Sequence, residues 1–197
     1  MTLYLHMRER SVTSLGPGKR YVLWVAGCNR NCPGCIAPDS HDMTNGTAVD
    51  VGALAWEILM SNAEGLTISG GEPFLQAEAL SELVRLIRRK QDMGVIVYTG
   101  FLHEELEAVP GAAALLAQTD LLIDGPYIRE LDDGHSLRGS SNQRVIPLTA
   151  RYSGALSLYG VPGRSTEVFH HGASIHYVGI PSNSQYPPDE SSSASEL

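Results

Sequence analysis

The sequence has no apolar run of the roughly 18 residues that a membrane span needs, and its first residues, MTLYLHMRER, lack the apolar core of a signal peptide. Basic residues are also few, since 14 Lys and Arg stand against 22 Asp and Glu and give a net charge of −8. A general nucleic-acid-binding protein is normally basic. We therefore expect a cytoplasmic globular protein that has neither a membrane nor a nucleic acid as its partner.

Cysteine is scarce as well, because its three copies, Cys28, Cys32 and Cys35, all lie in one short segment. A secreted disulfide framework would need an even number of cysteines spread along the chain. Clustered thiols in a cytosolic protein instead indicate metal binding or redox chemistry. A structural zinc site normally takes four protein ligands and would need a histidine such as His41. A four-iron cluster on three thiolates leaves one iron open to a small molecule. The spacing favours the cluster, and zinc is the alternative.

Apolar strands and amphipathic helices are predicted to alternate over residues 1–147, the expected core domain. This order is typical of a parallel α/β sheet with helices outside it. The expected strands are 21–26, 66–69, 95–98, 121–123 and 144–146, and helical patterns cover 51–59, 80–87 and 103–118. A β-rich extension is predicted for 148–181, with strands at 155–161, 167–169 and 174–180, followed by a flexible Ser-, Pro- and acid-rich tail at 182–197.

The unusual residues follow the ends of four predicted strands, in the segments Gly27–Cys35, Ser69–Pro73, Thr99–Phe101 and Asp124–Pro126. Ligands of parallel α/β sheets bind beyond the carboxyl ends of the strands. We therefore expect an active site at this rim.

A glycine-rich turn, Ser69-Gly70-Gly71-Glu72-Pro73, follows one of these strands. Two glycines let a backbone approach a ligand closely, and the carboxylate of Glu72 suits a ligand ammonium group. Alone, such a turn is most often a plain connection between a strand and a helix. Beside the cysteine segment, it becomes part of a recognisable pair.

The pair resembles the two signature motifs of the radical S-adenosylmethionine (SAM) superfamily: C-x3-C-x2-C after a first strand, and a GGEP turn after the next. Many members carry an aromatic residue before the third cysteine, where this chain has Gly34. The form C-P-G-C is similar to the branch that activates anaerobic ribonucleotide reductase. Segments 97–101, 122–127 and 137–144 are also similar to that branch, so the resemblance runs from about residue 16 to about residue 146.

The resemblance implies a partial (βα) barrel and a [4Fe–4S] cluster on the three cysteines, with SAM as a second cofactor. It also implies reductive cleavage of SAM to a 5′-deoxyadenosyl radical that installs a glycyl radical in a partner such as anaerobic ribonucleotide reductase. The electron donor would be a protein such as flavodoxin or ferredoxin. The implied SAM-binding residues are Gly34, Cys35, Ile36, Ser69, Gly70, Gly71, Glu72, Thr99 and Asp124.

The extension has no recognised counterpart in these activating proteins. The chain is therefore alternatively a stand-alone radical SAM enzyme that modifies a small metabolite or a peptide. A third hypothesis is a non-catalytic zinc or iron–sulfur module. The extension contains His170, His171 and His176, which form either a metal site or, as is more common, surface positions of strands. Trp24 and Tyr98, within strands, are predicted to be core residues.

Overall fold

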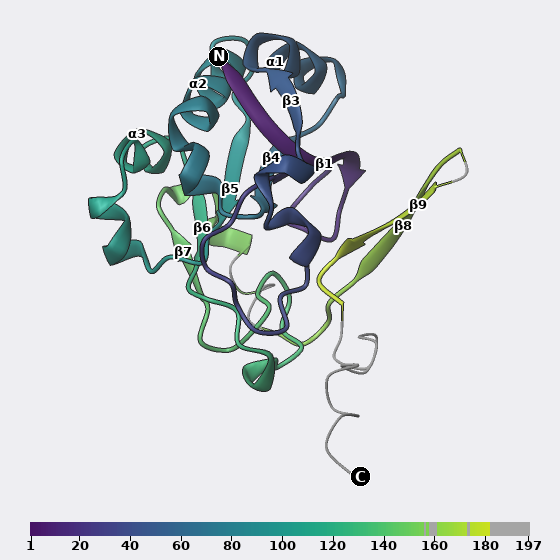
Figure 1. The fold of residues 1–197 in the computed structure, drawn as a ribbon, viewed down its shortest axis with the longest axis vertical. Helices are drawn as coiled ribbons and strands as arrows, with labels where there is room; N and C mark the ends of the chain where they lie inside the picture. Colours follow the sequence, from purple (N-terminus) through teal and green to yellow (C-terminus); the bar gives the residue numbers. More distant parts are fainter. Residues whose placement is uncertain (156, 158–160, 173, 182–197) are drawn as a thin grey trace.

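The computed structural model describes residues 1–155, 157, 161–172 and 174–181 (Figure 1). Its main feature is a seven-stranded sheet with the strand order β3-β1-β2-β4-β5-β6-β7. The strands are β1 (Thr2–Val12), β2 (Arg20–Val25), β3 (Thr47–Asp50), β4 (Gly65–Gly70), β5 (Gly94–Tyr98), β6 (Leu121–Asp124) and β7 (Arg144–Pro147). Among the described residues the sheet ends at β3 and β7, so the barrel is partial, as predicted.

The four central strands, β2, β4, β5 and β6, run parallel to one another. Helices α1 (Val51–Met60), α2 (Ala77–Arg88) and α3 (Ala112–Leu116) lie in the crossovers that parallel strands require. The outer strands β1, β3 and β7 pair antiparallel. The predicted α/β class and its five core strands are confirmed. Strands β1 and β3 were not predicted, and the helical segment 103–118 contains a 3-10 helix (His103–Ala108) before the short α3.

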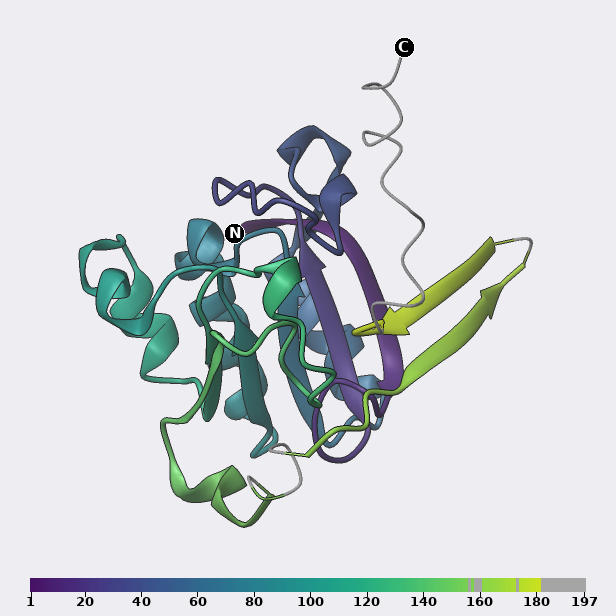
Figure 2. The ribbon, with the colours of Figure 1, turned by 90° about the horizontal axis from the view of Figure 1, so that it is seen from below.

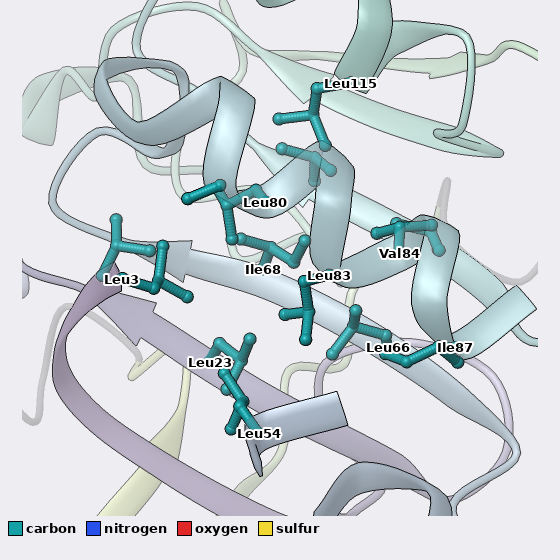
Figure 3. Close-up of a cluster of buried hydrophobic side chains, with 14 of the residues drawn as sticks. Leu3, Leu23, Leu54, Leu66, Ile68, Leu80, Leu83, Val84, Ile87 and Leu115 are labelled. Atoms are coloured by element: carbon teal, nitrogen blue, oxygen red, sulfur yellow. The ribbon is translucent and has the colours of Figure 1, made fainter. Parts of the chain in front are cut away.

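The helices cover one face of the sheet, and the main hydrophobic core lies between the helices and that face. Leu54 of α1 and Leu80 and Leu83 of α2 meet Leu23, Leu66 and Ile68 of the sheet (Figure 3). Alternate residues of a strand point to opposite faces. Leu23 and Val25 of β2 therefore pack under the helices, whereas Val22 and Trp24 belong to a second cluster on the other face. No helix in the described part of the chain is long and apolar enough to cross a membrane.

The C-terminal extension contains a separate two-stranded sheet, β8 (Thr166–His171) and β9 (Ser174–Gly179), which projects from the body of the molecule (Figures 1 and 2). These strands include the predicted segments 167–169 and 174–180, except that residue 180 follows β9. The predicted strand 155–161 is not found at Ala155, which ends a 3-10 helix (Ala150–Ala155). Residues 156 and 158–160 of that segment, and the predicted tail 182–197, lie outside the described residues.

The extension is attached to the inner face of the sheet. Val178 and Ile180 are buried in the second cluster with Val12, Leu15 and Val22. The carboxylate of Glu167 accepts hydrogen bonds from the backbone amides of Thr13 and Ser14, both at 2.8 Å. The base of the hairpin is therefore held by apolar packing and by hydrogen bonds to the turn after β1.

Arg20 is buried at the end of the sheet opposite to the carboxyl ends of the parallel strands. Its side chain is 1% exposed, and all of its donors are used. Its Nε donates to Thr67 Oγ1 at 2.5 Å, and its Nη2 donates to the carbonyl oxygens of Leu66 (2.5 Å) and Gly94 (3.1 Å). Its Nη1 donates to Tyr152 Oη at 3.0 Å and to the carbonyl of Pro17. One guanidinium group thus joins β2, β4 and β5.

We predict that Arg20→Met lowers the free energy of unfolding by about 3 kcal/mol or more, because several buried acceptors lose their donor. Urea denaturation of the protein followed by far-UV circular dichroism measures this loss. The matched control is Arg89→Met, at an exposed position after α2, which should change stability by less than about 0.5 kcal/mol. Equal stability of the two variants would contradict a structural role for Arg20.

Candidate functional site

The carboxyl ends of β2, β4 and β5 surround one cavity. Most of the residues predicted from the two motifs line it, namely Cys28, Cys32, Cys35, Ile36, Ser69, Gly70, Gly71, Glu72 and Thr99. These residues come from three loops that are far apart in the sequence. The parallel sheet brings them to one rim, as expected for this class of fold.

The cysteine loop, residues 27–37, begins directly after β2 and carries three free thiols, each partly buried. The backbone amide of Cys28 donates to the carbonyl of His41 at 2.9 Å, which holds the start of the loop. Backbone amides also point at two sulfurs: Arg30 N lies 3.4 Å from Cys28 Sγ, and Ala37 N lies 3.5 Å from Cys35 Sγ. Hydrogen bonds to the sulfurs are among the features that tune iron–sulfur clusters.

The three sulfurs are not gathered as the ligands of a single zinc ion would be. Ligands at 2.3 Å from one tetrahedral zinc lie about 3.8 Å apart. In the described part of the chain, one group of three His, Cys, Asp or Glu residues has ligand atoms that all lie within 4.8 Å of one another. The three cysteines are not that group. Burial raises the pKa of the Cys28 and Cys35 thiols. A bound metal centre would have to displace their protons, because the thiolate is the ligand.

The two glycines of the turn after β4 are required by close backbone packing. A Cβ on Gly71 would lie 2.2 Å from the carbonyl oxygen of Gly27, and one on Gly70 would lie 2.4 Å from the amide of Val25. Gly70 also has a φ of +105°, which side-chain-bearing residues rarely adopt. The amides of Gly71 and Glu72 donate to the carbonyls of Val25 and Gly27, both at 2.8 Å. The glycine turn therefore packs directly on the start of the cysteine loop.

Glu72 is completely buried at the edge of the cavity. Its Oε1 accepts from the amide of Phe74 (3.0 Å) and the hydroxyl of Thr99 (2.8 Å), and its Oε2 accepts from the amide of Gly100 (2.8 Å). Burial raises the pKa of this carboxyl, and the hydrogen bonds oppose that rise. The side chain thus joins the turn after β4 to the end of β5, a role that the motif alone does not reveal.

Asp124 and Gly34 do not line the cavity in the described structure. Asp124 is fully buried, and its carboxylate accepts from Arg144 Nε at 2.9 Å and from the amide of His103 at 2.7 Å. Gly34, with a φ of +69°, packs against Arg129, since a Cβ there would lie 2.5 Å from Arg129 Nε. The geometry therefore differs from the expectation of direct ligand contacts at these two positions.

Residues with no motif of their own complete the wall of the cavity. Trp24 and Tyr98 pack against core clusters, as predicted, but they also line the cavity. The alternation of β2 and β5 is a signal that places both on the inner face. Gln143 lines it from the segment before β7, with Oε1 accepting from the amide of Gly139 (2.8 Å) and Nε2 donating to the carbonyl of Gly125 (2.9 Å).

The extension also contributes to the wall, through Gly179 and Ile180. Arg164 holds this part of the chain in place, with a side chain that is 4% exposed. It pairs with Asp132 at 2.8 Å, and its Nη2 donates to the carbonyls of Arg138 (2.7 Å) and Gly139 (2.8 Å). No pattern in the sequence links these segments, so the contacts that hold this side of the cavity were not predicted.

A three-cysteine loop and a GGEP turn at the carboxyl ends of parallel strands, on a partial α/β barrel, define an iron–sulfur protein of the radical SAM type. Residues 14–146 match the family model described as "4Fe-4S single cluster domain". The chain belongs to this family, in the branch of the anaerobic ribonucleoside-triphosphate reductase-activating proteins.

Three relatives carry the name "Anaerobic ribonucleoside-triphosphate reductase-activating protein". The protein of Enterobacteria phage T4 is 34% identical over 136 residues, which cover 66% of this chain and 85% of the relative. That of Haemophilus influenzae is 34% identical, over 66% and 88% of the two chains. That of Escherichia coli K12 is 30% identical, over 66% and 89%. Among solved structures, QueE of Escherichia coli aligns with a TM-score of 0.46 and 13% identity, over 63% of this chain and 70% of that chain.

We predict that Gly71→Ala destabilises the protein by about 2 kcal/mol, because the added methyl group overlaps the backbone of Gly27 and overpacking costs about 1–3 kcal/mol. The cysteine loop should shift with it, so iron retained after anaerobic reconstitution should also fall. Gly154→Ala is the matched control, since a Cβ there meets no atom within 4 Å. Normal stability and iron content in Gly71→Ala would show that the turn and the loop are not coupled.

Proposed function

We propose that this protein is a radical SAM enzyme with a single [4Fe–4S] cluster on Cys28, Cys32 and Cys35. The observation that carries the proposal is that three thiols of one loop, set too widely for a single zinc ion, share a cavity with the GGEP turn. When bound, the cluster would supply the electron that cleaves SAM to methionine and a 5′-deoxyadenosyl radical, which abstracts a hydrogen atom from the substrate. The protein's share is to bind, to orient and to exclude water.

We assign the SAM-binding surface to the turn after β4 and the end of β5. Ser69, Gly70, Gly71 and Thr99 line the cavity beside the cysteines. Glu72 Oε2 accepts a hydrogen bond from Gly100 N, and a carboxylate oxygen has capacity for a second donor such as the ammonium group of SAM. Gly34 and Ile36 flank the third cysteine, and Ile36 lines the cavity.

We assign to Asp124 a positioning role. Its salt bridge to Arg144 joins the end of β6 to the start of β7. The loop that follows Asp124 supplies Gly125 and Tyr127 to the cavity wall. Asp124 would therefore act on SAM or on the substrate through this loop.

The favoured substrate is a glycine residue of a partner protein such as an anaerobic ribonucleotide reductase, with flavodoxin or ferredoxin as electron donor. The support is the match of residues 14–146 to the family model, together with relatives that are 34% identical and carry that activating role in their names. The described sheet ends at β3 and β7 without closing, and a protein loop would enter on that side.

A stand-alone enzyme acting on a small metabolite or a peptide is the second candidate. It is favoured by the extension, proposed to span residues 148–181 beyond a core domain of residues 1–147. Gly179 and Ile180 line the cavity, and the buried Arg164 holds the adjoining loop against it. A wall of this kind suits a substrate smaller than a protein loop.

The test is anaerobic reconstitution with iron and sulfide, followed by dithionite and SAM. We expect 5′-deoxyadenosine and methionine from the wild type, and neither cluster nor product from Cys32→Ala. Addition of the anaerobic reductase encoded in the same genome should produce a glycine-centred signal in electron paramagnetic resonance. Formation of 5′-deoxyadenosine without that signal would favour the second candidate. A protein that forms no 5′-deoxyadenosine with a full cluster is not a radical SAM enzyme.

We predict that Glu72→Gln retains the cluster but binds SAM at least about 10-fold more weakly, since a charge-assisted hydrogen bond contributes about 1.5–3 kcal/mol. The side-chain amide of the Glu72→Gln variant would also place N–H donors against the hydroxyl of Thr99 or the amide of Gly100, which are donors themselves. Equilibrium dialysis with labelled SAM measures the affinity, and visible absorption measures the cluster. Glu107→Gln, at an exposed position, is the control. Unchanged affinity in Glu72→Gln would limit Glu72 to its structural role.

A further inference from the structure

A second group of potential metal ligands lies outside the cysteine cavity, where the β8–β9 hairpin meets β1. Glu9 of β1 faces His171 of β8 and His176 of β9, and one ligand atom from each lies within 4.8 Å of the others. His171 Nε2 is 2.5 Å from Glu9 Oε2, and His176 Nδ1 is 3.8 Å from the same oxygen. The two imidazole rings lie 4.9 Å apart, centre to centre.

The hairpin register puts both histidines on one face. His171 pairs with Ser174, and His176 pairs with Phe169, so the two histidines are diagonal neighbours across the strands. His170 is the adjacent residue on β8 and therefore points to the opposite face. The sequence contains three histidines in the extension, but only the register selects the two that can act together.

The surroundings of these residues indicate a missing ligand. Glu9 is only 4% exposed, and no Lys or Arg among the described residues forms a salt bridge with it. Its other oxygen, Oε1, accepts from the amide of Arg10 at 3.0 Å. His176 Nδ1 is buried and has no hydrogen-bond partner. A buried polar atom without a partner is rare and calls for a physical explanation, such as an ion.

We propose that Glu9, His171 and His176 bind a divalent transition-metal ion of the zinc class. Two imidazole nitrogens and a carboxylate oxygen form a donor set that zinc accepts, whereas calcium and magnesium prefer oxygen ligands alone. Three protein ligands leave the fourth tetrahedral position to water. Ligand atoms 2.0–2.2 Å from zinc lie about 3.4 Å apart. This spacing lies between the 2.5 Å from His171 Nε2 to Glu9 Oε2 and the 3.8 Å from His176 Nδ1 to the same oxygen.

The ion would fasten the hairpin to the main sheet. It would join β1 to both strands of a hairpin whose backbone ladder is separate from that of the main sheet. Strand β9 ends at Gly179, which lines the cysteine cavity together with Ile180. His176 and Ile36 also line one groove between the hairpin and the cysteine loop. The metal would therefore set the position of one wall of the active-site region. This inference does not depend on SAM chemistry.

The experiment is calorimetric titration of Zn²⁺ into the full-length chain carrying Cys28→Ser, Cys32→Ser and Cys35→Ser, so that thiols do not compete. We expect one zinc ion per chain. His171→Ala and His176→Ala should each weaken zinc binding by at least about 100-fold. Loss of a residue that only hydrogen-bonds to a metal ligand weakens binding by about 10–100-fold, and loss of a ligand itself should cost no less. His170→Ala is the matched control and should bind zinc normally.

Two further measurements keep the test decisive. Glu9→Gln preserves side-chain shape, so weak zinc binding with an unchanged far-UV circular dichroism spectrum excludes misfolding as the cause. The wild-type protein with its cluster loaded, and thus its cysteines occupied, should bind the same single ion and show slower hydrogen exchange in residues 166–171. Absence of zinc binding, or equal binding by the His170, His171 and His176 variants, would reduce the trio to a carboxylate–imidazole hydrogen bond and overturn the proposal.

Discussion

The glycine turn after β4 packs on the first residues of the cysteine loop, and the geometry of the cavity depends on this contact. The amides of Gly71 and Glu72 donate to carbonyls on either side of the end of β2, and there is no room for a Cβ on Gly71. The carboxylate of Glu72 then accepts hydrogen bonds from the amide of Gly100 and the hydroxyl of Thr99. Three strand ends are thereby held together without any ligand. Such preorganisation suits a site that has to place a reactive group accurately.

The residues that stabilise the sheet and the residues that line the cavity lie in different parts of it. The helices bury one face in the main core, and the carboxyl ends carry the cavity. At the other end, the buried guanidinium of Arg20 donates hydrogen bonds to carbonyl groups of β4 and β5. The inner face is closed by Val178 and Ile180 of the extension. These two residues lie beyond residues 14–146, which match the family model.

The motifs were predictable because their chemistry is local. Three cysteines within one loop and a Gly-Gly-Glu-Pro turn can be recognised in any sequence, and strand alternation with helices placed both at one rim. Asp124 was harder to interpret, because its partner Arg144 is distant in the sequence and no periodicity links the two. Strand β1 was missed because its apolar residues are interspersed with polar and charged ones near the N-terminus, whereas the recognised strands were apolar runs.

The sequence by itself determined the class of fold, the cysteine set that can bind a metal centre and the order of the rim loops. These properties depend on residue types at short spacing, which folding does not alter. Only the tertiary structure decided that Glu72 bridges two strands, that Gln143 and Ile180 reach the cavity, and that Glu9 meets His171 and His176. Each of these contacts joins residues that are far apart in the chain, so it exists only once strand pairing and register have brought their backbones together.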